Sequence, residues 1–133
     1  MSVSFGYTIF YVPDVAAALS FYEAAFGLER RMLTPEQDYG ELATGVTTLA
    51  FVSEDLASSN IDAAGGFTRL DPAAPPVGAA ITLLTDDVAA VAATAVAAGA
   101  RSYTEPVLKP WGQTVAYLVD PFGVLIEVAT PIG

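Results

Sequence analysis

The chain contains no cysteine and no histidine. Without cysteine it cannot form disulfides, thiolate metal sites or a cysteine nucleophile. Without histidine it lacks the commonest general base and the commonest metal ligand near neutral pH. Any catalysis by this protein must therefore rely on carboxylates, tyrosines, lysine or water.

Basic residues are scarce. Five Lys and Arg accompany 15 Asp and Glu, which gives a net charge of −10. Phosphate backbones repel such a surface, so we expect no nucleic-acid partner. A cationic ligand would be attracted, although the same charge also keeps a protein dissolved when it binds nothing.

Long apolar runs are absent as well. No stretch of 18 apolar residues is present, so the sequence predicts no transmembrane helix. The opening residues, MSVSFGYTIF, contain no basic segment followed by an apolar stretch and a cleavage site. We therefore expect no signal peptide, no membrane partner and a cytoplasmic location. The length of 133 residues, 53% of them hydrophobic, suits one compact domain with a core.

The sequence does contain an internal repeat: one strand–helix unit occurs twice. The stretch GYTIFYVPDVAAALSFYEAAFGL (6–28) is followed by GAAITLLTDDVAAVAATAVAAGA (78–100). In both, an apolar strand precedes a segment whose apolar residues recur at the spacing of one helix face. Each predicted helix has an aspartate that can cap its start and a glycine that can end it. These are Asp14 and Gly27 in the first copy, and Asp87 and Gly99 in the second.

Three further strand-like runs follow each predicted helix. They read ERRMLT, YGELAT and TTLAFVS in the first half, and RSYTEP, TVAYLV and VLIEVAT in the second. Gly45 and the DPFG stretch (120–123) are typical of the hairpin turns between the last two strands of each half. The sequence therefore predicts two β-α-β-β-β modules within one domain over 1–133: module 1 at about 3–60, a Gly- and Pro-rich linker at 61–77, and module 2 at about 78–131.

Two such modules at this length resemble the vicinal oxygen chelate superfamily, which includes glyoxalase I, ring-cleaving dioxygenases, fosfomycin-resistance enzymes and bleomycin-resistance proteins. The segment VPDVAAALSFYEAAFGL is similar to the family's first strand–helix unit, and DPFGVLIEVATP is similar to its last turn and strand. The resemblance implies an α+β fold in which the two modules form a curled mixed sheet around a ligand-binding cleft. It also implies a homodimer, and it leaves open whether one chain closes the cleft or two chains exchange modules.

The resemblance further implies where a metal would bind. The four ligand positions of the metal-using members fall on Tyr7, Ala50, Ala80 and Glu127, and only Glu127 matches the family pattern. Alanine has no donor atom, and one carboxylate cannot hold a metal that needs three or more protein ligands. We therefore expect neither a metal nor another cofactor.

Strand alternation suggests what lines the cleft instead. If Ala50 faces it, Leu49 and Phe51 face the helices. A two-residue turn at Gly45-Val46 would pair Ala43 with Thr48 and Glu41 with Ala50, and would place Tyr39 beside Glu41. A slip of one residue would turn both side chains outward.

The predicted ligand-binding residues combine aromatic rings with carboxylates, which suits a flat or cationic ligand. Three of them also allow a structural role: Tyr7 as core filler, Glu127 in an ion pair with Arg69 or Arg101, and Trp111 at a subunit interface or on the end of the barrel. The full predicted set is Tyr7, Tyr39, Glu41, Trp111 and Glu127.

These features favour a metal-free small-molecule-binding protein of the glyoxalase/bleomycin-resistance type, which would sequester a cationic or aromatic antibiotic or metabolite. The alternative is a glyoxalase-like lyase or isomerase that uses Glu127 as a base, or an atypical metal site that includes Glu41 and Glu127. A third possibility is a structural or regulatory partner whose cleft is vestigial. The fold alone does not decide among them.

Overall fold

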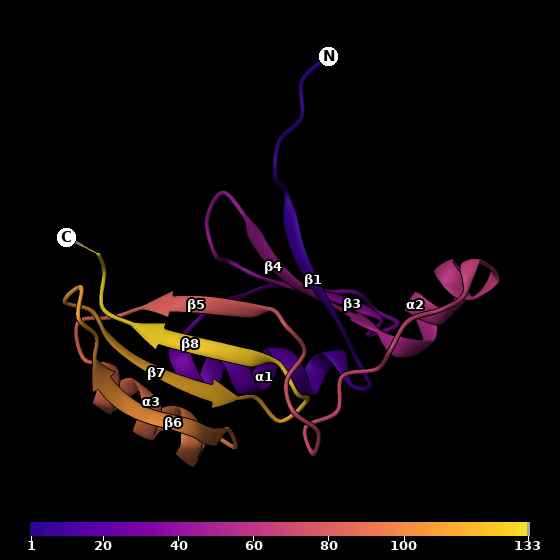
Figure 1. Ribbon diagram of the computed structural model, residues 1–133. Coiled ribbons are helices and arrows are strands. Elements are labelled where there is room, and N and C mark those ends of the chain that lie inside the picture. The colour runs from indigo at the N-terminus through magenta and orange to yellow at the C-terminus, as the bar shows by residue number, and fades with distance from the viewer. Residues whose placement is uncertain (133) are drawn as a thin grey trace. The chain divides into compact units, whose positions relative to one another are not determined.

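The structure, a computed structural model, describes residues 1–132. The chain divides into two compact units: Met1–Glu23 with Gly27–Arg69, and the remainder from Leu70 onward together with Ala24–Phe26. Each unit contains one four-stranded sheet, and the chain path can be followed by colour in Figure 1.

The first unit has the order β-α-β-β-β followed by a further helix. Strand β1 runs parallel to β4, while β3 pairs with β4 and with β2 in antiparallel fashion, so the strand order is β1-β4-β3-β2. The elements are β1 (Tyr7–Val12), α1 (Val15–Phe26), β2 (Arg30–Leu33), β3 (Tyr39–Leu42), β4 (Thr48–Ser53) and α2 (Glu54–Ile61).

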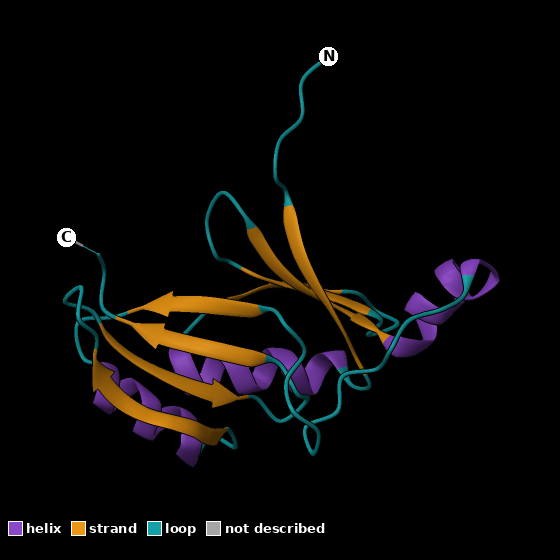
Figure 2. Ribbon diagram, viewed as in Figure 1, coloured by secondary structure: helices purple, strands orange, loops and turns teal. Residues whose placement is uncertain are grey.

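The second unit repeats this topology, with strand order β5-β8-β7-β6 and a parallel β5–β8 pair. Helix α3 covers one face of the sheet and contacts β6, β7 and β8 (Figure 2). The elements are β5 (Ala80–Leu84), α3 (Val88–Ala97), β6 (Arg101–Leu108), β7 (Thr114–Val119) and β8 (Leu125–Ala129). The predicted α+β class and the two βαβββ modules are confirmed.

Both predicted helix starts are capped as expected. The Asp14 carboxylate accepts a hydrogen bond from the Ala17 amide at 3.0 Å, and Asp87 accepts one from the Ala90 amide at 3.1 Å. Each bond satisfies an amide that has no partner within the helix. Gly27 ends α1 with a φ of 67°, a left-handed conformation that glycine adopts without steric cost.

Helix α2 and the 3₁₀ turn that follows it (Asp62–Ala64) were not predicted; they occupy the end of module 1 and the start of the predicted linker. The sequence does hold a signal for this helix. Ser53 caps it by accepting from the Leu56 amide at 3.1 Å, and Glu54 and Asp55 place negative charge in its first turn. The helix is short and mostly polar, so no apolar periodicity marks it.

The turn between β3 and β4 differs from the predicted two-residue hairpin. Strand β3 ends at Leu42 and β4 begins at Thr48, so the connection is a wider loop. Thr44 closes this loop, because its hydroxyl donates to the Thr47 carbonyl and accepts from the Leu49 amide, both at 2.9 Å. The predicted register nevertheless holds, since Glu41 pairs with Ala50.

The core of the first unit lies between α1 and its sheet. The rings of Tyr22 and Phe51, both fully buried, lie 5.3 Å apart, which confirms that Phe51 faces the helix. Gly40 allows α1 to approach β3 closely: a Cβ at this position would lie 2.6 Å from Leu19 Cδ1. Any larger residue at position 40 would require the side chains of Leu19 and Val15 to shift.

The DPFG turn is organised by a buried carboxylate. Asp120 is 1% exposed, and its Oδ1 accepts from the amides of Phe122, Gly123 and Val124 at 2.8–2.9 Å. Gly123 has a φ of 110°, and a Cβ there would lie 3.0 Å from the Asp71 backbone. The turn therefore requires both an acceptor at position 120 and glycine at position 123.

Among the described residues, no helix is long and apolar enough to cross a membrane.

Candidate ligand-binding site

Tyr39 and Glu41 lie on the face of the first sheet that is turned away from Phe51 and α1. Tyr39 pairs with Val52 and Glu41 with Ala50, and paired residues share a face. The predicted register and direction of both side chains are therefore confirmed.

The two side chains contact each other directly. The Tyr39 hydroxyl donates to Glu41 Oε2 at 2.5 Å, and Arg31 Nε lies 3.4 Å from Glu41 Oε1. Glu41 is only 7% exposed, so its carboxylate is one of the few buried polar groups of this unit. A buried carboxylate needs such partners, because without them desolvation strongly disfavours its charged form.

Burial and the bond to Glu41 set the protonation of Tyr39. Desolvation, the hydrogen bond to Glu41 and the negative charge of Glu41 raise the pKa of Tyr39 well above its ordinary value, while Arg31 partly offsets this. Tyr39 is therefore a neutral donor across the physiological pH range, and it holds the Glu41 carboxylate in place.

Tyr7 shares this face, because it pairs with Thr48 on β4. It is 56% exposed, which argues against the alternative that it fills the core. The next aromatic residue on the same side of β1, Tyr11, packs edge-to-face on Phe67 with ring centroids 4.9 Å apart. The face thus offers aromatic surface beside the Glu41 carboxylate.

The second unit contains a similar arrangement at Glu127. Tyr117, the cross-strand neighbour of Glu127, donates its hydroxyl to Oε2 at 2.6 Å, and Thr82 donates to Oε1 at 2.9 Å. The hydrogen bond to Glu127 raises the pKa of Tyr117, and burial and the charge of Glu127 act in the same direction. Tyr117 is therefore also a neutral donor near pH 7.

Hydroxyl groups, rather than arginines, are the partners of Glu127. Arg69 forms its ion pair with Glu54 at 3.3 Å, and the Arg101 guanidinium donates to the Pro72 carbonyl at 3.2 Å. The alternative in which Glu127 serves as the counter-ion of one of these arginines is therefore not supported. None of the ion pairs within the described part of the chain includes Glu127.

Trp111 lies on the hairpin between β6 and β7 and is 65% exposed. Its indole N–H donates to Gln113 Oε1 at 2.8 Å, and Gln113 Nε2 donates to the Thr130 carbonyl at 2.7 Å. This chain of hydrogen bonds ties the exposed ring to the end of β8. The placement of Trp111 around a common cavity with Tyr7 and Glu127 stays a prediction.

Sequence reasoning missed three residues that contact the two carboxylates: Arg31, Thr82 and Tyr117. Tyr117 could have been found, because counting back from the DPFG turn pairs Val119 with Leu125 and then Tyr117 with Glu127. Arg31 could not, since β2 contains an irregularity between Arg30 and Met32 that breaks simple alternation.

Each unit thus contains one Tyr–Glu pair on the face of its sheet. No group of three or more Asp or Glu side chains within the described residues is placed to hold a metal ion. The expectation that the protein works without a metal stays a prediction.

Comparison with known proteins identifies the family. A sequence model of the Glyoxalase/Bleomycin resistance protein/Dioxygenase superfamily matches residues 4–128. The chain belongs to this superfamily. A search of curated protein sequences found no significant match.

Solved structures agree on the fold. A glyoxalase/bleomycin resistance protein/dioxygenase family enzyme from Burkholderia phytofirmans PsJN is similar at 18% identity and a TM-score of 0.79, over 96% of this chain and 98% of that one. A glyoxalase-related enzyme from Fulvimarina pelagi is similar at 19% identity and a TM-score of 0.78, over 98% and 89%. A superfamily member from Sphaerobacter thermophilus DSM 20745 is similar at 21% identity and a TM-score of 0.71, over 98% and 99%.

Proposed function

We propose that this protein binds a small organic cation with a flat or aromatic body, and that it does so without a metal ion. The observation that carries the proposal is the Tyr–Glu pair on each sheet. In both pairs a neutral tyrosine hydroxyl fixes a carboxylate, at 2.5 Å for Tyr39–Glu41 and at 2.6 Å for Tyr117–Glu127. Fixed carboxylates beside aromatic rings are the features that recognise delocalised cations.

The chemistry of the pairs supports this ligand class. A carboxylate oxygen has more than one acceptor direction, so an oxygen that accepts from a hydroxyl can still accept from a cationic N–H. A charge-assisted hydrogen bond contributes about 1.5 to 3 kcal/mol and a cation–π contact about 0.5 to 2 kcal/mol. After the cost of association, these contacts correspond to dissociation constants between about 1 µM and 1 mM. The net charge of −10 would further attract a cation.

Binding of this kind needs no catalytic group. We infer that the protein sequesters its ligand, an antibiotic or a metabolite, as the bleomycin-resistance type of the superfamily would. We place the ligand contacts at Tyr7, Tyr39, Glu41, Trp111 and Glu127, with Tyr117 added as the residue that positions Glu127.

A lyase or isomerase is the second candidate, because two of the similar structures are described as enzymes. It would use Glu127 as a base, or a metal held by unusual ligands. A bound compound recovered unchanged after prolonged incubation, as judged by mass spectrometry, would favour binding over catalysis.

Calorimetric titration with benzamidinium and with benzamide tests the proposal. The two compounds have nearly the same shape and both carry N–H groups, but only the first is cationic at pH 7.5. We expect saturable binding of the cation and at least about tenfold weaker binding of benzamide, because only the cation gains a charge-assisted hydrogen bond to the carboxylates. Equal affinity for both compounds would contradict the proposed ligand class.

We also propose that the protein is a homodimer. Strand β1 is an edge strand of its sheet, and apolar side chains alternate along it and the residues before it, with Val3, Phe5, Tyr7 and Ile9 all exposed by 43% or more. An exposed apolar edge favours pairing with a second copy. Sedimentation equilibrium at micromolar concentration is expected to give twice the chain mass, and a monomer would contradict the proposal.

A further inference from the structure

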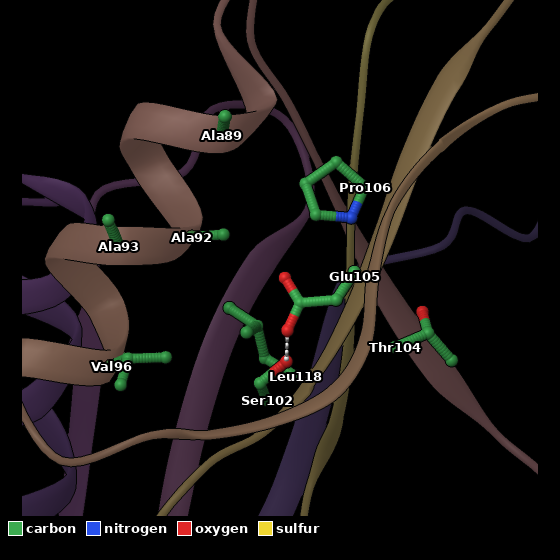
Figure 3. A pocket seen from close by; sticks show the side chains of 9 residues that line it. All are labelled: Ala89, Ala92, Ala93, Val96, Ser102, Thr104, Glu105, Pro106 and Leu118. Atoms are coloured by element: carbon green, nitrogen blue, oxygen red, sulfur yellow. Dashed lines mark hydrogen bonds between the residues drawn. The ribbon is translucent and has the colours of Figure 1, made fainter.

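A cavity of about 390 Å³ that is open to solvent lies at the surface of the second unit, between α3 and the edge strand β6 (Figure 3). None of the four residues of the Tyr–Glu pairs lines this cavity. Its volume is near the lower end of the range for small-molecule pockets. Apolar side chains form most of the wall: Ala89, Ala92, Ala93, Val96, Pro106 and Leu118.

The internal repeat explains why this space is open. The offset of 73 residues that aligns Asp14 with Asp87 also aligns the four α3 residues of the wall with residues of α1. Two of the replacements remove bulk, because Leu19 becomes Ala92 and Glu23 becomes Val96. In full, Ala16, Leu19, Ser20 and Glu23 correspond to Ala89, Ala92, Ala93 and Val96.

In the first unit the corresponding region holds a cation. Arg30 Nη2 on β2 donates to Ser20 Oγ at 3.2 Å and to Glu23 Oε1 at 2.9 Å, so a serine and a carboxylate together bind one guanidinium. Both acceptors belong to α1, and their counterparts on α3 are Ala93 and Val96. The second unit has therefore lost this guanidinium site from its helix.

The strand supplies the same pair of groups instead. The Ser102 hydroxyl donates to Glu105 Oε1 at 3.3 Å, and Figure 3 shows both side chains on the side of β6 that faces α3. Regular alternation would place residues three apart on opposite faces. A bulge removes this alternation, because Ser102 pairs with Leu118 while Thr104 pairs with Tyr117. Bulges at sheet edges commonly re-aim a side chain in this way.

Glu105 has no cation of its own. In the described part of the chain, residues 1–132, no Lys or Arg forms an ion pair with it. The nearest arginine in the sequence, Arg101, is directed elsewhere: it donates to the Pro72 carbonyl at 3.2 Å and lies over the Tyr103 ring. A carboxylate and a hydroxyl therefore border an apolar cavity without the guanidinium that such a pair binds in the first unit.

We propose that the cavity between α3 and β6 is a second binding site, for a small molecule with a guanidinium or ammonium group and a short aliphatic body. The cationic group would contact Glu105 and Ser102, and the aliphatic body would lie between the alanines of α3 and Leu118. This site is separate from the ligand-binding site proposed at the Tyr–Glu pairs, and the two proposals do not depend on each other.

Chemical-shift titration of the ¹⁵N-labelled full-length chain tests the proposal, with N-butylguanidinium as the probe and N-butylurea as its neutral analogue of the same shape. We expect saturable shifts of the amides of Ala92, Val96, Ser102 and Glu105 with the cation, and at least about tenfold weaker binding of the urea. Equal binding of the two compounds, or shifts confined to β7 and β8 around Glu127, would overturn the proposal.

Two variants sharpen the test. Glu105→Gln keeps the shape of an exposed side chain and should weaken N-butylguanidinium binding at least about tenfold, whereas Glu36→Gln removes the same charge from an exposed loop and should leave affinity unchanged. Ala92→Leu restores the residue found at the equivalent position of α1 and should weaken binding by occupying part of the cavity. Wild-type affinity in Glu105→Gln would overturn the proposal even if Ala92→Leu failed to fold.

Discussion

Replacing Asp120 by alanine is expected to lower the free energy of unfolding by about 3 to 5 kcal/mol. The substitution leaves the amides of Phe122, Gly123 and Val124 without the acceptor that all three share. A buried donor that loses its partner costs about 1 to 3 kcal/mol, and water reaching the opened turn would recover part of the sum. Urea denaturation followed by circular dichroism measures the change.

Asp120→Asn is the matched control. Its side-chain carbonyl can still accept at the position of Oδ1, so we expect a loss of only about 1 to 2 kcal/mol. If the alanine and asparagine variants were equally stable, the three amide bonds would not be what holds the turn together.

Glu127→Gln is expected to weaken binding of benzamidinium by about 10- to 100-fold. Glutamine has nearly the same shape, but it lacks the charge that makes the interaction with a cation strong, and about 1.5 to 3 kcal/mol converts to this range of affinity. Calorimetric titration at pH 7.5 gives the dissociation constants directly.

Two further variants separate charge from position. Tyr117→Phe leaves the Glu127 charge intact but removes the hydroxyl that orients it, so we expect a smaller loss of about three- to tenfold. Glu36→Gln removes one negative charge as well, but at an exposed position, and should have little effect. If Glu127→Gln bound no more weakly than Glu36→Gln, Glu127 would be a packing residue only.

Much of the fold could be predicted because local and longer-range signals agree. Asp14 and Asp87 mark the helix starts, the apolar spacing marks their buried faces, and the repeat doubles every signal. Helix α2 was not predicted because it has almost no apolar face. Its only signals in the sequence are a serine cap and two acidic residues in its first turn.

The site was predictable only where strand pairing is regular. The Glu41–Ala50 pair was confirmed although the turn beside it was wrong, because the alternation of the two strands fixes the register regardless of how Thr44 closes the loop. The cavity beside α3 could not be foreseen. A bulge decides the direction of Glu105, and the volume of the cavity depends on which small side chains α3 directs towards β6.

Calorimetric titration of benzamidinium into protein dialysed against EDTA, compared with the same protein supplied with Zn²⁺, Ni²⁺ or Mn²⁺, tests metal-free cation binding most directly. Elemental analysis of the dialysed sample would verify that no transition metal remains. We expect the same dissociation constant, between about 1 µM and 1 mM, in every sample, because the carboxylates of Glu41 and Glu127 act through their tyrosine-fixed oxygens. Binding that appeared only after a metal was added, or that disappeared with the removal of a stoichiometric metal, would contradict metal-free binding.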